Sequence, residues 1–440
     1  MALGGGTFLT QNKVLPGTYH NFISKARAFV NLSNRGYVGL PIVLDWGVDG
    51  DVFTVTQEDL QKSSRKIFGY DYTDPKLKGI RDVFKNAITV YFYRLVVGAV
   101  AATNTFAIAK YKGVRGNDIK IVIHANVDEP TKFDVQTLLD NVLVDEQTAV
   151  TDAKGLTEND YVMFKSDATL AETAGTALTG GSNGSAVTGG AHQEALDSLE
   201  AYGFNTIGCL SSEPTIKSLY VEYTKRLRDQ VGAKLQIVGH KLGAADHEGI
   251  IDVQNDANGT DEEIFGAVYW TVGAQAGVAV NKSNTNKKYD GEHTLVMSET
   301  MTQPQLTALL KAGKYVFHRV GDEIRVLEDV NTFTSFTPVK NEDFSMNQVI
   351  RVLDQIAIDT ATLFNTRYLG KVPNDQSGRV SLWGDIVTHR RELQGIRAIQ
   401  NFDPEQVVVE QGNSKKSVVV DEVIEPTVAM SQLYITTTVA

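Results

Sequence analysis

Hydrophobic and polar positions follow two rhythms along the chain, and each rhythm predicts a different element. From Arg35 onward, short runs of β-branched and aromatic residues are followed by segments whose apolar residues recur every three or four positions. The runs predict strands in GYVGLPIVLDW, TVYFYRLV, FNTIGCL and AKLQIVGH, and the segments predict helices in TQEDLQKSSRKIFG, PKLKGIRDVFKNA, HQEALDSLEAYG and TIKSLYVEYTKRLRDQVG. Alternating strands and helices favour parallel strands with crossover helices, so we expect an α/β (α+β) core with a mixed sheet and flanking helices.

The pattern changes between about Thr103 and Ala177. Short β-type runs are separated there by Gly, Asn and Asp turns, and the glycine- and serine-rich LTGGSNGSAVTGGAHQ follows as a hinge. We expect a small β-rich domain at 98–180, inserted between a first part of the core at 35–97 and a second part at 181–425. The second part includes a C-terminal subdomain from about residue 310.

A long helix is predicted from about Met346 to Leu369. Ser345 is the expected N-cap, with Gln348 three residues later, and Gly370 follows the last turn. Five positions at helical spacing form the expected core stripe, namely Val349, Leu353, Ile356, Thr360 and Leu363. A second helix is expected around Ile386 to Gln400, followed by a hairpin in VVVEQGNSKKSVVVDE.

Both ends of the sequence have the pattern of extended arms. Residues 1–34 contain Gly4 to Gly6 and Pro16-Gly17 without sustained helical periodicity, and 426–440 ends in LYITTTVA. Strand alternation puts Leu433, Ile435 and Val439 on one face of that ending, opposite Tyr434. A β-competent segment at a chain end needs a partner sheet, either in its own molecule or in a neighbour.

Composition narrows the class of protein. A chain of 440 residues with 42% apolar and 22% charged residues has material for two or three domains, and no apolar run reaches membrane-spanning length. The N-terminal sequence lacks the features of a secretion signal, so we expect cytoplasmic synthesis. A net charge of −11 argues against nucleic acid as a partner, and the single Cys209 excludes an intramolecular disulfide and a thiolate metal cluster.

Two motifs come close to known ligand sites and fail at the decisive positions. GSAVTGGA, residues 184–191, resembles a phosphate loop, but Gly190 and Ala191 replace the phosphate-binding Lys and the metal-binding Ser or Thr. QNDANGTDEEIF, residues 254–265, resembles a calcium loop, but Gln254 and Phe265 replace its first and last ligands. The eight histidines include no HExxH pair, so we expect no metal and no cofactor.

Three other features leave alternatives open. Cys209 and His240 follow predicted parallel strands, where an α/β enzyme would place a pocket, although a buried structural cysteine is the simpler interpretation. The basic helix THRRELQGIR, with Arg390, Arg391 and Arg397, is either a solvated face or an electrostatic contact with an acidic partner. An adhesive surface-layer polymer is a third possibility, against which the missing secretion signal counts.

Several stretches in order along the whole chain resemble contractile tail sheath proteins of bacteriophages and phage-tail-like particles. They are LGGGTFLTQNKVLPGTYHNF with its Pro-Gly-x-Tyr element, GYVGLPIVLDWGVDGDVFTVT, KIFGYDY, YKGVRGNDI, LTGGSNG and KAGKYVFHRVGDEIRVLEDVNTFTSF. The similarity is greatest to sheath proteins of defective prophages and R-type bacteriocins of Gram-positive hosts.

The resemblance implies a core built from both chain ends, a peripheral insert, and a non-enzymatic sheath subunit. It implies a homopolymer of stacked rings around an inner tail tube, with baseplate and tail terminator proteins as further partners, assembled in the bacterial cytoplasm and released in a particle on lysis. Both arms are then expected to join the sheet of a neighbour through Phe8, Leu9, Val14, Leu15, Leu433, Tyr434, Ile435 and Val439. Arg390, Arg391 and Arg397 become candidates for contact with the inner tube.

Overall fold

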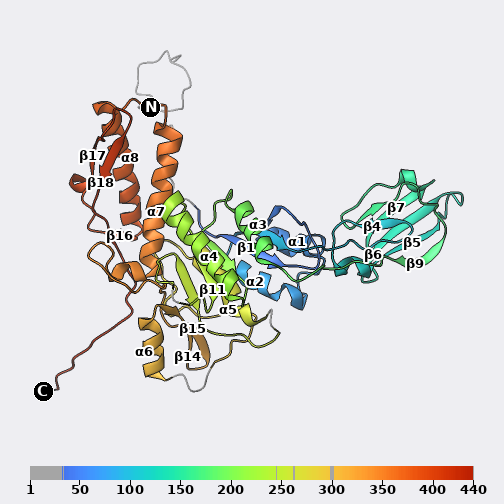
Figure 1. Ribbon diagram of the computed structural model, residues 1–440, viewed down its shortest axis with the longest axis horizontal. Helices are drawn as coiled ribbons and strands as arrows, with labels where there is room; N and C mark the ends of the chain where they lie inside the picture. Colours follow the sequence, from blue (N-terminus) through green and yellow to red (C-terminus); the bar gives the residue numbers. More distant parts are fainter. Residues whose placement is uncertain (1–31, 33, 244, 261–262, 298–301, 440) are drawn as a thin grey trace, which may run out of the picture.

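A central sheet organises the molecule, and a β-rich unit and a helical unit project from it in different directions (Figure 1). The computed structural model describes residue 32 and residues 34–243, 245–260, 263–297 and 302–439. In spatial order the sheet contains β13 (Lys314–Tyr315), β12 (Ile250–Val253), β11 (Gln236–His240), β10 (Thr206–Cys209), β1 (Tyr37–Val43), β3 (Thr89–Leu95) and β2 (Val52–Thr56).

Strands from both sides of the inserted β-rich segment meet in this sheet. β1 pairs in parallel with β10 on one side and with β3 on the other, while β2 runs antiparallel to β3 at the edge. The mixed sheet and its helices confirm the α/β class expected from the alternating pattern.

Helices cover both faces of the sheet. One face carries α1 (Gln57–Phe68), α2 (Lys78–Phe84) and α5 (Gly266–Gly277), and the other carries α3 (Gly189–Leu199) and α4 (Pro214–Arg226). Neighbouring strand residues supply the two apolar cores alternately, because successive strand side chains point to opposite faces: Ile250 belongs to the α4 side and Ile251 to the α5 side. α1 shows how local chemistry fixes an element, since Thr56 and Asp59 form a capping box at its start and Gly69 ends it at φ 80°.

The β-rich unit projects from the sheet on the side opposite α7 and α8 (Figure 1). Its strands are β4 (Ala107–Ala109) with β8 (Val162–Phe164), and the four-stranded β7 (Val142–Val150), β6 (Phe133–Leu139), β5 (Ile119–Ala125) and β9 (Thr173–Ala177). The segments that enter and leave the unit run side by side, because Val100 bridges Ser182 and Thr103 bridges Thr179.

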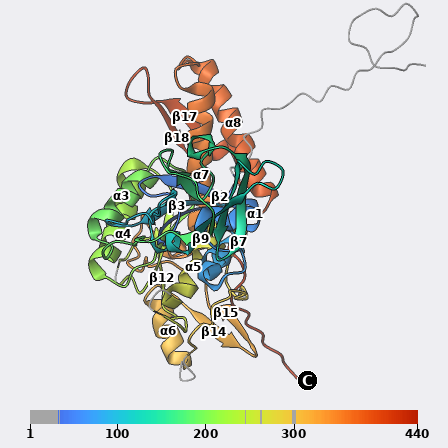
Figure 2. The same ribbon diagram turned by 90° about the vertical axis from the view of Figure 1, so that its right-hand side faces the viewer.

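The C-terminal third adds further elements. They are α6 (Gln303–Lys311), β14 (Phe317–Val320), β15 (Glu323–Val326), α7 (Asn347–Leu363), α8 (Gln376–Gly395), β16 (Ile399–Gln400), β17 (Val408–Gln411), β18 (Val418–Asp421) and β19 (Glu425–Pro426). Of these, β14 and β15 join the main apolar core. α7 and α8 stand side by side above the sheet in both views (Figures 1 and 2). The hairpin expected in VVVEQGNSKKSVVVDE is confirmed as β17 and β18, with Val408 opposite Asp421.

The long helix forms and begins at Asn347, one residue from its expected start, but the expected N-cap is wrong. Met346 occupies the N-cap position without a side-chain cap, and the Ser345 hydroxyl instead donates to the carbonyl of Glu342. After Leu363 the helix widens into a π-turn, Phe364–Tyr368, and Gly370 follows at φ 70°. The expected apolar stripe is only partly buried, whereas Arg351, Gln355 and Asp359 are buried on the same helix.

The buried polar residues of α7 join it to the core. Asp354 accepts two guanidinium hydrogen bonds from Arg228, each at 2.8 Å, and Arg351 pairs with Asp329 at 3.2 Å. In the described part of the chain, no helix combines the length and the apolar character required to cross a bilayer.

Candidate assembly surfaces

The C-terminal segment runs away from the body of the protein, and both ribbon views place its end in the open (Figures 1 and 2). Within the described residues, 427–439 form no strand, and Leu433, Tyr434, Ile435 and Val439 are 82%, 87%, 74% and 90% exposed. Four large apolar side chains so close together are unusual on a free surface. The N-terminal counterparts Phe8, Leu9, Val14 and Leu15 lie outside the described residues.

The hairpin β17–β18 offers strand edges for such a segment. In the described part of the chain these two strands form a sheet of their own, so each has one edge without a strand partner. A two-stranded sheet is marginal by itself, and here α8 supports it: the Trp383 indole donates to the carbonyl of Val407 at 3.0 Å, and Val409 packs in the same cluster.

A cavity lies beside each strand of the hairpin. One, of about 410 Å³, is lined by Gln376, Arg379, Val380, Trp383 and residues 409–411 of β17. The other, of about 430 Å³, lies between the π-turn and β18 and includes Tyr368, Leu382, Lys415 and Val418. Each open strand edge therefore borders a hollow over the helical layer.

The valine runs of the hairpin carry a signal that the sequence analysis missed. Val409, Val418 and Val420 face α8, but Val408 and Val419 on the other face are also apolar and stay largely exposed. A strand that is apolar on both faces is typical of a sheet covered on both sides. The outer face of the hairpin therefore exposes Val408 and Val419 together with Glu410 and Asp421, which stand opposite them, and its own subunit leaves this face uncovered in the described residues.

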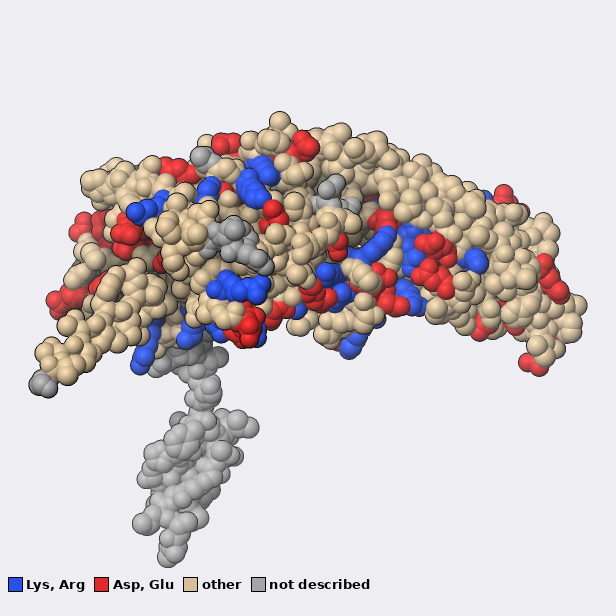
Figure 3. All heavy atoms as spheres, turned by 90° about the horizontal axis from the view of Figure 1, so that it is seen from below, with Lys and Arg blue, Asp and Glu red and all other residues tan. Residues whose placement is uncertain are grey.

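The three arginines proposed for tube contact separate in the structure. Arg390 is 2% exposed, forms two hydrogen bonds to Glu422 at 2.7 and 2.9 Å, and donates to Nδ1 of His389. This corrects the interpretation of Arg390 as a surface contact, because α8 turns its side chain into the interface with α7. Arg391 and Arg397 are exposed. On the face seen from below, basic and acidic side chains are interspersed (Figure 3).

The strand-end residues of the enzyme alternative are not arranged as a reactive pair. Cys209 is fully buried in β10, and that burial raises the pKa of its thiol to about 12, so it supplies no thiolate near neutral pH. Nε2 of His240 forms a hydrogen bond of 2.6 Å with Asp256, which is the Asp of the calcium-like loop. Both side chains therefore already have a partner. In the phosphate-loop-like segment, Thr188 serves as the N-cap of α3.

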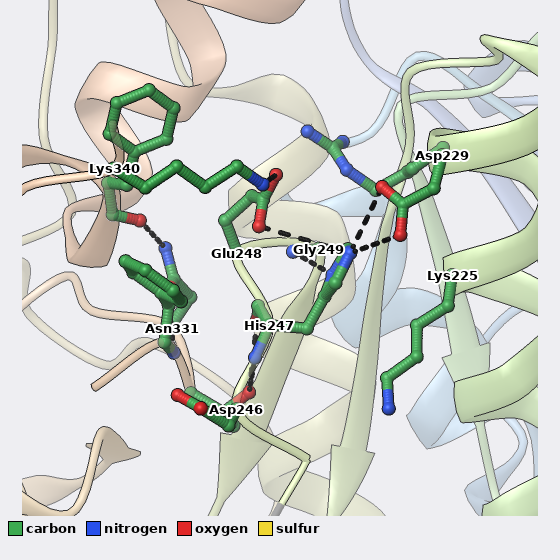
Figure 4. Close-up of polar contacts among 12 residues, drawn as sticks. Lys225, Asp229, Asp246, His247, Glu248, Gly249, Asn331 and Lys340 are labelled. Atoms are coloured by element: carbon green, nitrogen blue, oxygen red, sulfur yellow. Dashed lines mark hydrogen bonds and ion pairs between the residues drawn. The ribbon is translucent and has the colours of Figure 1, made fainter. Parts of the chain in front are cut away.

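Asp229, His247 and Glu248 form the one acidic and histidine cluster with metal-like spacing that the described residues contain (Figure 4). Its hydrogen bonds do not suit a metal. Nδ1 of His247 accepts from the N–H of Gly249 at 2.9 Å, so the ring proton is on Nε2 and points to Asp229 at 3.1 Å. A metal at Nε2 requires the opposite tautomer. Burial lowers the pKa of His247, which keeps the ring neutral, and Glu248 is paired with Lys340 at 2.7 Å.

Comparison with known families covers nearly the whole chain. Consecutive segments match the tail sheath protein Gp18 domain III N-terminal region at 35–95, the phage tail sheath protein beta-sandwich domain at 97–183, the phage tail sheath protein central domain at 185–332 and the phage tail sheath C-terminal domain at 339–440.

Individual proteins give the same result. The chain is 31% identical to the phage-like element PBSX protein XkdK of Bacillus subtilis (strain 168), over 98% of this chain and 99% of that protein. A crystal structure of the sheath tail protein from Desulfitobacterium hafniense is 36% identical and superposes with a TM-score of 0.81, over 95% of this chain and 99% of the other. The contracted helical sheath of the anti-feeding prophage, at 12% identity, shares the fold with a TM-score of 0.56 over 97% of this chain and 99% of the other.

Proposed function

The chain belongs to the phage tail sheath family and is a structural subunit of a contractile sheath, and from this premise we propose how it assembles. It polymerises as stacked rings around an inner tail tube, and the C-terminal segment of each copy adds to the hairpin β17–β18 of another copy. The observation that supports this is the pairing of an exposed apolar donor, Leu433 to Val439, with a hairpin whose edges and outer face are open.

Strand addition suits this donor and this acceptor. An extended segment that joins a sheet edge gains main-chain hydrogen bonds without a large rigid docking surface. The uncovered Val408 and Val419 and the 410 Å³ hollow beside β17 provide apolar surface for its side chains. Because donor and acceptor are different surfaces, the contact is heterologous, and such contacts build rings or helical tubes.

The assembled sheath works by releasing stored free energy. It forms in a long, kinetically trapped arrangement and then shortens and widens, which drives the inner tube through the envelope of a target cell. The donated segments keep neighbouring subunits tethered while they rotate. The anti-feeding prophage sheath, whose fold this chain shares, is described in a contracted state, and this supports a contracted form here.

The other partners follow from the place of a sheath in a particle. We propose contacts with an inner tail tube protein, baseplate proteins and a tail terminator, with assembly in the bacterial cytoplasm and release on lysis. The working division is an N-terminal arm at 1–34, a core at 35–97 and 181–425, an insert at 98–180 and a donated segment at 426–440.

Arg391 and Arg397 are the remaining candidates for the tube contact. Reversing both charges is expected to weaken sheath and tube co-assembly, and unchanged co-assembly would overturn that assignment.

Cysteine cross-linking tests the donor and acceptor directly. A chain carrying Ile435→Cys and Glu410→Cys is treated with a short bismaleimide, and Cys209 stays silent because it is fully buried. The expected product is a ladder of covalent oligomers. The matched control joins Ile435→Cys with Lys62→Cys on α1, whose side chain is 72% exposed and lies far from the hairpin in sequence. Equal ladders from both pairs would contradict donation to β17–β18.

A further inference from the structure

The C-terminal segment leaves the body of the protein at a sharply defined point. Glu425 and Pro426 pair with Gln400 and Ile399 in the β16–β19 ladder, and the next residue, Thr427, donates its N–H to the carbonyl of Ala398 at 2.9 Å. Main-chain pairing therefore carries the segment as far as Thr427.

A side chain takes over where the ladder stops. Nε2 of Gln348, in the first turn of α7, donates to the carbonyl of Thr427 at 3.0 Å, and Oε1 of the same amide accepts the N–H of Ala429 at 3.0 Å. One primary amide thus presents a donor and an acceptor to alternate backbone groups, as a neighbouring strand would. Gln348 is only 4% exposed, so its side chain is held in place by the surrounding residues, whereas its partners Thr427 and Ala429 lie nearer the surface.

The hold ends directly after Ala429. Met430 is 99% exposed. Among the described residues from Met430 to Val439, the side-chain hydrogen bond joins two members of the segment itself, Tyr434 and Gln432. Val428, Ala429 and Ser431 border a small cavity of about 70 Å³ that Gln348, Met346 and Glu328 also line, so the last hydrogen bond to the body is at Ala429 and the last contact is at Ser431. The boundary between the held part and the free part falls at the residue that Gln348 binds.

We propose that Gln348 is a positioning residue that clamps the root of the donated segment. The clamp fixes the direction in which the segment departs and the length that is free to reach a neighbour. The free part, 430–439, spans at most about 35 Å when extended, and release of 427–429 would add about 10 Å. A longer free segment without a fixed direction loses more conformational freedom when it binds a neighbour, so assembly weakens. The effect on assembly rests on the proposed strand donation, whereas the clamp itself does not.

Replacement of the amide separates the clamp from simple packing. Gln348→Met keeps the length and volume of the side chain but removes both hydrogen bonds, and Gln348→Asn keeps the amide on a stem too short to reach. In full-length protein kept dilute, amide hydrogen exchange at Ala429 is expected to accelerate about tenfold or more in both variants. Gln394→Met, at an exposed position of α8, is the control that leaves this exchange unchanged.

Two readouts keep the failure modes apart. Tryptophan fluorescence, to which Trp46, Trp270 and Trp383 all contribute, reports whether the protein remains folded, and polymer yield by sedimentation reports assembly. Faster exchange together with a lower polymer yield supports the proposal. Unchanged exchange at Ala429 overturns the clamp, whatever the polymer yield. Faster exchange with the polymer yield of the wild type overturns the positioning role alone. Absence of polymer in the wild type contradicts strand-mediated assembly, and the exchange measurement then still decides whether the clamp exists.

Discussion

At the residue scale, neighbours with the same side chain have opposite roles on α8. Arg390 lies between α8 and α7, where it bonds Glu422, His389 and Thr360, while Arg391 is exposed to solvent. Sequence composition marks both as one basic cluster. What separates them is the direction each takes from the helix, and adjacent residues on a helix point about 100° apart.

Loss of Arg390 is expected to destabilise the C-terminal module. Arg390→Ala removes the ion pair with Glu422 and the donor to Nδ1 of His389, although Nε2 of His389 keeps Asp359, and the loss costs about 3 kcal/mol of unfolding free energy. Arg391→Ala, at the next position, is expected to change stability by less than about 0.5 kcal/mol. Urea denaturation followed by tryptophan fluorescence measures both. Equal midpoints for the two variants would show that the Arg390 network contributes nothing.

His192 makes stability depend on pH. It lies on the buried face of α3 with Nδ1 at 2.9 Å from the Tyr220 hydroxyl, and burial lowers its pKa from 6.5 to about 4. The unfolded chain therefore binds more protons between these values, so the stabilisation is complete above pH 6.5 and declines as the pH falls toward 4. The decline attributable to this group is about 2–3 kcal/mol.

His192→Gln keeps a partner for Tyr220 but cannot titrate. Comparing unfolding free energies at about pH 7.5 and about pH 4.5, the variant is expected to lose less stability than the wild type. Identical pH dependence in the two chains would contradict the assignment of this titration to His192.

At the scale of elements, local pattern predicted most of the core and failed where tertiary contacts dominate. Strands β1, β3, β10 and β11 and helices α1 to α4 follow their expected periods, and the hairpin is confirmed, because each buries a face that its own sequence makes apolar. Strands β2, β7 and β9 were not predicted. α7 departs from this rule. Its apolar stripe is partly exposed, whereas Arg351 and Asp359 are buried because their partners, Asp329 and His389, come from other elements. Gln355 is buried beside them and donates to Asp359 on the same helix.

The predicted N-cap of α7 was wrong for a related reason. Ser345 and Gln348 have the spacing of a capping box, but Gln348 binds Thr427 and Ala429, which lie at the far end of the chain. A local motif cannot reveal a partner so distant in sequence. The acceptor role of the hairpin was equally hidden, although its continuous valine runs could have indicated a sheet covered on both faces.

The ion pair between Arg228 and Asp354 is the contact that most directly couples α7 to the core. Both side chains are at least nine-tenths buried, and both hydrogen bonds measure 2.8 Å. Asp354→Ala leaves an unpaired buried guanidinium and is expected to cost about 3–5 kcal/mol. Asp343→Ala, at an exposed site before the same helix, is the control. Chemical denaturation that shows similar midpoints for the two variants would contradict the coupling.

At the scale of the whole molecule, the β-rich unit is fixed to the core rather than loosely attached. Trp46, which follows β1 in the core, is buried in the apolar cluster of that unit and packs edge-on against Tyr111 at 5.2 Å. Arg115 of the unit donates to the carbonyl of Gly69 at 2.8 Å and lies over the Tyr70 ring at 4.3 Å. The two parts are therefore expected to move together.

Trp46→Ala is expected to loosen this junction. Removal of a large buried side chain costs about 3–5 kcal/mol, and here the loss falls on both parts. Limited proteolysis should cut near 97–103 and 179–185, where the unit joins the core, earlier in the variant than in the wild type. Wild-type resistance at these connections would show that Trp46 does not hold the two parts together.

The central claim is that this chain polymerises into a sheath through its C-terminal segment. Electron microscopy of negatively stained protein, at several concentrations, tests it most directly when the full chain is compared with a chain lacking Leu433–Ala440. The account predicts hollow striated tubes from the full chain and folded, dispersed particles from the shortened one. Tubes of normal form from both chains would contradict strand donation by this segment, and dispersed particles from both at every concentration would contradict self-assembly of the subunit.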